Sequence, residues 1–396
     1  MSKKESDLLK AFEQEFGTAG EATYFSPGRI NLIGEHTDYN GGHVFPSAIT
    51  LGTYGVYRAR DDRKVCLFSG NFASLGVIEF DLDHLEFEKD HQWANYAKGM
   101  IRYLSEDYGT LPHGFDCYIY GTIPNGAGLS SSASLELLIG VIVNEEYGLN
   151  ASRLALIKLG KKVENEFIGV NSGIMDQFAV GMGQKNHAIL LDCETLAYDL
   201  VPVKMDNHVI VIMNTNKRRE LADSKYNERR AECEEALKLI QSVEQVESLG
   251  QLTIAQLEKV QGLFESNETL YRRARHAVSE NQRTLDAKEA LEANQLTVFG
   301  QLLNASHTSL RDDYEVTGKE LDTIVAHAQA QEGTLGARMT GAGFGGCAIA
   351  LVEKEAVTTF INHVGQAYEQ EIGYPAAFYV ADIADGTSLL SEGAHV

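Results

Sequence analysis

Residues 124–134 read PNGAGLSSSAS and separate two apolar segments of different length. The segment before them, 115–120, is short and rich in β-type residues, which predicts a strand. The segment after them has seven apolar residues between Leu135 and Val143, spread over every side, and predicts a buried helix over 130–147. The unpaired N–H groups at the start of such a helix favour a bound anion.

The Gly-rich turn itself has the composition of a phosphate-binding loop. Gly126 and Gly128 lack Cβ atoms, so the backbone turns sharply and approaches a ligand closely. Ser130, Ser131 and Ser132 supply hydroxyl groups for phosphate oxygens, and one of them could ligate Mg²⁺. A Walker loop needs a lysine that is absent here, so the design is a different one. A plain strand-to-helix turn capped by serine is the alternative.

A second dense stretch, residues 28–42, reads GRINLIGEHTDYNGG. Between Arg29 and Asp38 it carries a cation, two carboxylates, an imidazole and an amide on what we predict to be a loop. Such a set of hydrogen-bonding groups suits a polyhydroxylated ligand, and a solvated loop is the alternative. A zinc site from His36 and His43 is not indicated, because their spacing fits no familiar ligand pattern.

A third stretch, residues 336–347, reads GARMTGAGFGGC. Gly341, Gly343 and Gly346 fit the dinucleotide pattern G-x-G-x-x-G, but we expect this motif to precede a strand instead of following one. We therefore reject that interpretation and expect a backbone turn on the nucleotide side of a cleft.

Two carboxylates outside these stretches are further candidates. Asp176 has apolar neighbours that would hold it half-buried, and its alternative role is a helix cap. Glu164 stands on a predicted helix, where a solvated face is the alternative.

Composition limits the class of protein. The 396 residues predict two or three domains, and 44% hydrophobic residues supply a core. A net charge of −22 argues against nucleic acid or an anionic membrane as the partner. The charged N-terminus has no signal-peptide pattern, no apolar run could span a bilayer, and five scattered cysteines suit a reducing compartment, so we expect a cytoplasmic protein.

The order of elements predicts an α+β fold with two lobes. Short strands dominate the first half of the chain, and long charged helices follow in the second half. We expect an N-terminal lobe over 1–200 and a C-terminal lobe over 201–396.

In combination, the three stretches resemble the small-molecule kinase superfamily of galactokinase, homoserine kinase and mevalonate kinase. Residues 28–39 resemble the galactokinase signature almost letter for letter. The resemblance implies mixed sheets packed against helices and an active site in the cleft between the lobes. It also implies ATP-dependent phosphorylation of the C1 hydroxyl of α-galactose, with galactose and ATP as partners and no obligate protein partner.

The resemblance also assigns residues to each ligand. The sugar would be held by Glu35, His36, Thr37, Asp38 and Tyr226. The nucleotide would be held by Ser69, Gly126, Ala127, Gly128, Leu129, Ser130, Ser131 and Ser132. Mg²⁺ would be held by Ser132 and Glu164.

In the same resemblance Asp176 is the base and Arg29 its partner. A carboxylate within hydrogen-bond reach accepts the hydroxyl proton as the bond to phosphorus forms. Arg29 would keep Asp176 ionised and stabilise charge on the transferred group. Because a loose transition state needs little pull from a base, Asp176 would also orient the sugar.

Two alternatives remain at this stage. The chain could act on a related sugar, such as a galactosamine derivative, arabinose or galacturonate, although Glu35 weighs against a sugar with a C6 carboxylate. It could also be a galactose sensor that binds both ligands without turnover.

Overall fold

A mixed sheet with the strand order β13-β1-β3-β6-β4-β5 underlies the first half of the chain in the computed structural model, which describes residues 2–124, 127–170, 172–217 and 222–392. Strands β4 and β6 are parallel and the other neighbours antiparallel. The strands are β1 (Ala22–Asn31), β3 (Pro46–Ala59), β4 (Lys64–Ser69), β5 (Ile78–Asp81), β6 (Phe115–Gly121) and β13 (Ser388–Glu392).

Helix α3 (Ser131–Glu146) packs against β1 and β3 of this sheet. Leu137, Leu138 and Ile139 are completely buried, so the predicted buried helix is confirmed. The other helices of this half are α1 (Lys3–Phe16), α2 (Ala94–Tyr108), α4 (Arg153–Lys162), which continues into a π-helical turn η4 (Val163–Ile168), and α5 (Met175–Met182).

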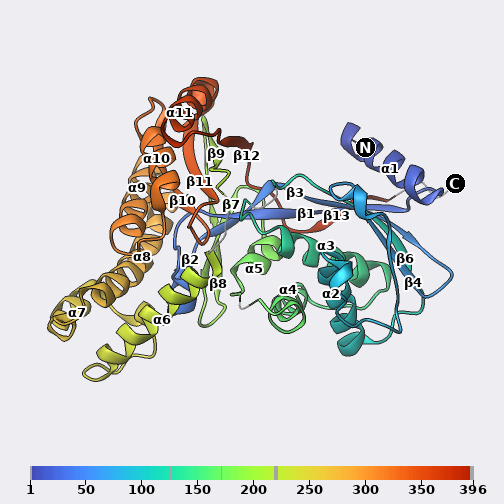
Figure 1. Cartoon of the computed structure of the whole chain (residues 1–396), viewed down its shortest axis with the longest axis horizontal. Helices are drawn as coiled ribbons and strands as arrows, with labels where there is room; N and C mark the ends of the chain where they lie inside the picture. The colour runs from blue at the N-terminus through green and yellow to red at the C-terminus, as the bar shows by residue number, and fades with distance from the viewer. Residues whose placement is uncertain (1, 125–126, 171, 218–221, 393–396) are drawn as a thin grey trace.

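The second half of the chain builds a four-stranded antiparallel sheet with the order β10-β11-β9-β12. Its strands are β9 (His208–Asn214), β10 (Thr334–Thr340), β11 (Cys347–Glu353) and β12 (Ala377–Ala381). The helices are α6 (Ala222–Gln241), α7 (Ile254–Lys259), α8 (Glu268–Glu292), α9 (Leu296–Asp312), α10 (Gly318–Gln329) and α11 (Val357–Ile372). A small sheet of β2 (His43–Val44), β7 (His187–Asp192) and β8 (Tyr198–Pro202) lies between the two larger sheets (Figure 1).

Short helical turns complete the chain at η1 (Asp38–Asn40), η2 (Ala73–Leu75), η3 (Lys89–His91), η5 (Leu249–Gln251), η6 (Gln261–Phe264) and η7 (Lys354–Ala356). Over the described residues, every helix is too short or too polar to reach across a bilayer.

Helices α6 to α11 lie beyond the left end of the long strands β1 and β3, whereas helices α2 to α5 lie below these strands (Figure 1). Besides a core in each half, a third apolar cluster combines residues of both, including Ile30, Phe45, Phe299 and Ile349. Strand β13 returns from the end of the chain to pair with β1. The expected lobe boundary near residue 200 stays a prediction. Strand β13 comes from the predicted C-terminal lobe but belongs to the sheet of the first half.

Two predictions about local structure were wrong. Arg29 to Asn31 belong to strand β1 and not to a loop. Pro27 and Gly28 are typical of a turn in the sequence, but in the structure a β-bulge between them allows the strand to continue through the proline. Strand β10 precedes the glycines at 341–346, so this motif does follow a strand. It leads into the antiparallel strand β11 instead of a helix, so the dinucleotide pattern is still not met.

Candidate active site

Strand β1 and helix α5 bring Arg29 and Asp176 together. Arg29 Nε donates to Asp176 Oδ1 at 2.9 Å, and Arg29 Nη2 donates to Oδ2 at 3.1 Å. The Arg29 side chain is only 6% exposed, whereas Asp176, in the first turn of α5, is 31% exposed. The pair is therefore anchored on the arginine side and open on the carboxylate side.

The predicted phosphate-binding loop (residues 127–132, the phosphate loop) is bonded to the same ion pair. Ser130 Oγ donates to Asp176 Oδ2 at 2.5 Å, and Arg29 Nη1 donates to the Gly128 carbonyl at 2.8 Å. Ser130 has a left-handed backbone (φ 62°), so its side chain reaches Asp176 instead of capping α3. Ala127 and Leu129 are buried and anchor the loop, and Gly126 lies outside the described residues.

Past this point the loop becomes helix α3, where the remaining two serines have different environments. Ser131 is exposed at the first position of α3. Ser132 Oγ donates to Glu164 Oε1 at 2.6 Å, and the Ser172 hydroxyl donates to Glu164 Oε2. Burial, reinforced by the charge of Asp176, raises the pKa of Glu164. Glu164 is thus a buried carboxylate beside the loop and not part of a solvated helix face.

A second buried carboxyl, which the sequence did not single out, links α3 to α5. Gln177 Nε2 donates to Glu136 Oε2 at 3.0 Å, and both residues are completely buried. Glu136 Oε1 and Gln177 Oε1 have no partner among the described residues. Burial and the charges of Glu164 and Asp176 raise the pKa of Glu136 well above its usual range. The environment of Glu136 therefore favours the neutral form of its carboxyl group.

The sugar-signature loop is held from the opposite direction, by the second half of the chain. The Gly341 N–H donates to Glu35 Oε1 at 2.9 Å, and Arg338 Nη1 lies 3.4 Å from the same oxygen. Glu280 Oε1 accepts from the Gly34 N–H at 3.0 Å and from Ser306 Oγ at 2.6 Å. All of these side chains are buried, so the position of Glu35 is fixed by three elements of the second half.

Glu280 is a buried anion inside this support. Burial alone would raise its pKa, but the positive charges of Arg283 and Arg338, together with His276, hold the pKa of Glu280 at about 2. Arg338 is also fully buried and donates to the Asn31 and Leu32 carbonyls at 2.9 and 3.0 Å. Sequence reasoning missed Glu280, because a glutamate on a charged helix has the pattern of a solvated one.

His36 and Thr37 have partners in the protein. His36 Nδ1 lies 2.8 Å from the Tyr39 hydroxyl, and His36 Nε2 lies 3.1 Å from the Ala342 carbonyl oxygen. Thr37 Oγ1 donates to the carbonyls of Gly34 and His43 at 2.8 and 2.6 Å. Both side chains therefore hold the loop in shape, and neither ring nitrogen of His36 is left for a sugar hydroxyl in this conformation.

Asp38 and Tyr226 lie at the open side of the loop. A Cβ atom at Gly173 would come within 2.8 Å of Asp38 Oδ2, so the backbone before α5 touches this carboxylate. Burial, with a contribution from the charge of Asp176, raises the pKa of Asp38. The Tyr226 ring centroid is 5.5 Å from that of His36. The sugar loop therefore lies next to both helix α6 and the segment before Asp176.

The glycine motif of the second half borders the phosphate loop. A Cβ atom at Gly341 would lie 3.6 Å from the Gly128 carbonyl oxygen, and one at Gly343 would lie 2.3 Å from the Val316 carbonyl oxygen. Both glycines have positive φ angles, so other residues would be strained there. Ser69 is more remote, because it ends β4, which β3 and β6 separate from β1; its role as a nucleotide contact stays a prediction.

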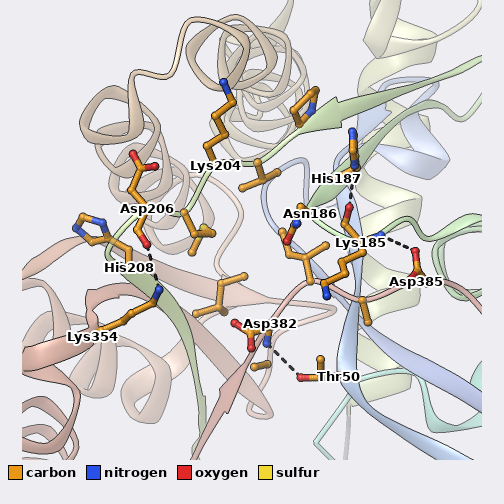
Figure 2. A pocket seen from close by; sticks show the side chains of 17 residues that line it. Thr50, Lys185, Asn186, His187, Lys204, Asp206, His208, Lys354, Asp382 and Asp385 are labelled. Atoms are coloured by element: carbon orange, nitrogen blue, oxygen red, sulfur yellow. Dashed lines mark hydrogen bonds between the residues drawn. The ribbon is translucent and has the colours of Figure 1, made fainter.

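A cavity of about 790 Å³ lies elsewhere, where the segment after β12 passes the loops around β7 and β9 (Figure 2). Its charged lining is mixed: Lys185, Lys204 and Lys354 face the same space as Asp206 and Asp382. None of the predicted site residues is among its described lining residues. It is therefore separate from the site at Asp176.

Three models of known protein families match separate segments of the chain. The galactokinase galactose-binding signature matches residues 10–59, the N-terminal domain of the GHMP kinases matches 95–184, and their C-terminal domain matches 287–370. The galactokinase of Enterococcus faecalis is 61% identical over 383 residues, which are 97% of this chain and 99% of that protein.

Solved structures agree with this match. The crystal structure of Lactococcus lactis galactokinase complexed with galactose has a TM-score of 0.93 and 56% identity, covering 98% of this chain and all of that one. Methanococcus jannaschii mevalonate kinase, 19% identical with a TM-score of 0.67 over 92% of this chain and 99% of that one, shares the fold. The predicted α+β kinase fold, with mixed sheets against helices, is thus confirmed. The chain belongs to the galactokinase family of the GHMP kinases and is an ATP-dependent sugar kinase that converts α-D-galactose to galactose 1-phosphate.

Proposed function

We propose that Asp176 is the general base of this reaction and Arg29 its charge-stabilising partner. A bond forms between the C1 oxygen of galactose and the γ-phosphorus of ATP, the bond from that phosphorus to ADP breaks, and the hydroxyl proton passes to Asp176. The observation that supports these roles is that Arg29 and Ser130 donate hydrogen bonds to the two carboxylate oxygens of Asp176, while the Asp176 side chain stays 31% exposed. Such a group is oriented before the substrate arrives.

The nucleotide lies, in this proposal, along residues 126–132 and the start of α3. Ala127, Gly128 and Leu129 offer backbone groups, and the serine hydroxyls and the positive end of the α3 dipole attract phosphate oxygens. Arg29, anchored to the Gly128 carbonyl at 2.8 Å, is positioned to stabilise charge on the transferred phosphoryl group.

Ser132 and Glu164 would hold Mg²⁺. Their oxygens are 2.6 Å apart and are the hard donors that Mg²⁺ prefers. Among the described residues, no group of three or more His, Cys, Asp or Glu side chains could hold a metal alone, which fits an ion completed by substrate phosphates. When bound, Mg²⁺ would neutralise phosphate charge and offset the repulsion between Glu164 and Asp176.

Galactose lies, in this proposal, against Glu35, Asp38 and Tyr226, with His36 and Thr37 shaping the loop that carries the first two. Carboxylates accept hydrogen bonds from sugar hydroxyls in a fixed pattern. Asp38 borders both Tyr226 and the backbone at Gly173, beside the base. The five scattered cysteines, typical of a reducing compartment, support a cytoplasmic location in this proposal.

The test is Asp176→Asn, which keeps the shape of the side chain and removes the base. We expect turnover to fall at least about a hundredfold, while calorimetry still detects galactose binding. The matched control is Asp62→Asn. Asp62 also accepts two hydrogen bonds from one arginine, Arg60, both at 2.7 Å, but on the surface, so turnover should stay unchanged. Near-normal turnover by a folded Asp176→Asn protein would refute the assignment of the base.

A further inference from the structure

A chain of hydrogen bonds runs from helix α6 to the sugar loop. The Cys233 thiol lies 3.1 Å from the Tyr314 hydroxyl, and the Tyr314 hydroxyl lies 2.6 Å from the Tyr39 hydroxyl. Tyr39 continues the chain to His36 Nδ1 at 2.8 Å, and His36 Nε2 ends it at the Ala342 carbonyl oxygen at 3.1 Å. Each member of the chain uses its polar atoms inside the protein.

The carbonyl at the end of this chain determines the direction of every bond. A carbonyl only accepts, so His36 must carry its proton on Nε2. Burial, with repulsion from His276, lowers the pKa of His36 to about 3, so the ring is neutral and Nδ1 accepts. Tyr39 must then donate to Nδ1, Tyr314 must donate to Tyr39, and the Cys233 thiol must donate to Tyr314.

The chain joins the sugar loop to three separate elements of the second half. Cys233 is on α6, the helix that also carries Tyr226, Tyr314 follows α9, and Ala342 is in the turn between β10 and β11. His36 itself has a left-handed backbone, with φ at 60°, a conformation that persists only when its surroundings hold it. The His36 ring thus connects the loop that carries Glu35 and Asp38 to the second half of the molecule.

We infer that His36 is a positioning residue for galactose and not a ligand of a sugar hydroxyl, and that the Tyr39 hydroxyl, supported by Tyr314, fixes its tautomer. This inference rests on the proposed function only in taking Glu35 and Asp38 as the sugar contacts. It predicts that the affinity for galactose depends on phenol groups that do not touch the sugar.

The direct test is nitrogen NMR of the full chain labelled with ¹⁵N-histidine, with a His36→Asn variant to identify the signal. We expect a neutral His36 protonated on Nε2, both in the free protein and with saturating galactose. A ring protonated on Nδ1, or an Nε2 proton that leaves Ala342 when galactose binds, would overturn the inference. Since this measurement needs no turnover, its outcome is independent of the role of Asp176.

The second test is Tyr39→Phe, which removes one hydroxyl and leaves His36 Nδ1 without its donor. We expect the KM for galactose to rise roughly tenfold, the usual consequence of one lost buried hydrogen bond, with kcat and the KM for ATP within about twofold of the original. The His36 nitrogen signals should shift in the same variant.

The matched control is Tyr368→Phe, which loses a buried hydrogen bond of 2.7 Å to the Thr215 carbonyl in the core of the second half. General destabilisation would act in both variants, whereas the inference requires a changed galactose KM in Tyr39→Phe alone. An unchanged galactose KM in a folded Tyr39→Phe protein would refute the positioning role. If Tyr39→Phe does not fold, the tautomer of the unmodified chain decides the question.

Discussion

The two sides of the site are held in opposite ways. On the proposed phosphoryl side, Arg29 and Ser130 bond to Asp176, and Ser132 bonds to Glu164. All five residues belong to the first half of the chain. On the sugar side, the loop from Gly34 to Tyr39 is held by residues of the second half. These are Glu280, Ser306, Tyr314, Arg338, Gly341 and Ala342.

Because of this difference, the residues proposed for catalysis and those proposed for sugar binding depend on different contacts. The residues proposed for the chemistry bond only to other residues of the first half in these contacts, so we expect their geometry to survive small shifts between the halves. The sugar loop depends on contacts between residues about 240 to 310 positions apart, so any such shift changes it first. Changes on the phosphoryl side should therefore lower kcat, and changes in the support of the sugar loop should raise the KM for galactose.

The largest effect should come from Glu280→Ala. This change leaves the Gly34 N–H, the Ser306 hydroxyl and the partly buried Arg283 without their acceptor. Removing one partner of a buried charged pair costs about 3–5 kcal/mol of unfolding free energy. Thermal unfolding of the full chain should show a large loss of stability, and any folded fraction should have a raised galactose KM.

Glu280→Gln is the matched variant, because its amide oxygen still accepts from the Gly34 N–H. It should recover much of the galactose KM while remaining less stable than the original, since Arg283 loses its counter-charge. If Glu280→Ala lowered kcat and left the galactose KM unchanged, the separation between the two sides would be wrong.

Arg29→Ala tests the phosphoryl side. Losing one preorganised cation should cost about 3 kcal/mol of transition-state stabilisation, on the order of a hundredfold in kcat. Arg29→Lys keeps the charge but not the two-pronged contact with Asp176, so it should recover only part of the rate. Steady-state kinetics with both substrates varied would measure this, and an unchanged kcat in Arg29→Ala would dismiss the role.

The local part of this site could be predicted from the sequence, and the long-range part could not. The buried helix α3 and the serines before it follow from apolar pattern and glycine spacing, which are local signals. Sequence context already made Asp176 and Arg29 candidates, family resemblance assigned their roles, and the structure brings their side chains to 2.9 Å. Their roles stay predictions.

What remained hidden depends on contacts between distant segments. Glu280 has the sequence context of an ordinary helix residue, and only tertiary packing makes it completely buried. Glu136 stands in the helix predicted to be buried, but its partner Gln177 is on a different helix. Strand β13 has a partly exposed, short sequence that becomes a strand by pairing with β1. The His36 chain likewise needs Tyr314 and Ala342, which lie 278 and 306 positions further along the sequence.

Glu136→Gln, a change on the phosphoryl side, should make the folded protein more stable at neutral pH. Because the folded pKa of Glu136 is raised, its contribution to stability is complete below the unfolded value, near about 4.3, and is lost as pH rises toward the folded value. A glutamine has no proton to lose and still pairs with Gln177. The unfolding free energy of the variant, relative to that of the original protein, should therefore increase as pH rises from 5 to 8, by at most about 1.4 kcal/mol per pH unit.

The measurement is thermal unfolding against pH, in EDTA and without ATP, so that no ion occupies the neighbouring Glu164. Glu145→Gln, an exposed glutamate on the same helix, is the control and should show no such trend. A stability difference that does not change with pH would mean that Glu136 is already ionised in the fold.

The smallest effect should come from Gly173→Ala, at a point where the two sides meet. Its new Cβ atom would approach Asp38 Oδ2 to 2.8 Å, so the carboxylate must move by a fraction of an ångström. Such crowding costs about 1 kcal/mol, equivalent to roughly a fivefold rise in the galactose KM. Gly262→Ala, with open space around the new atom, is the control and should change nothing. Because Gly173 stands three residues before Asp176, a fall in kcat without a change in KM would show that the backbone couples the two sides more tightly than their side-chain contacts do.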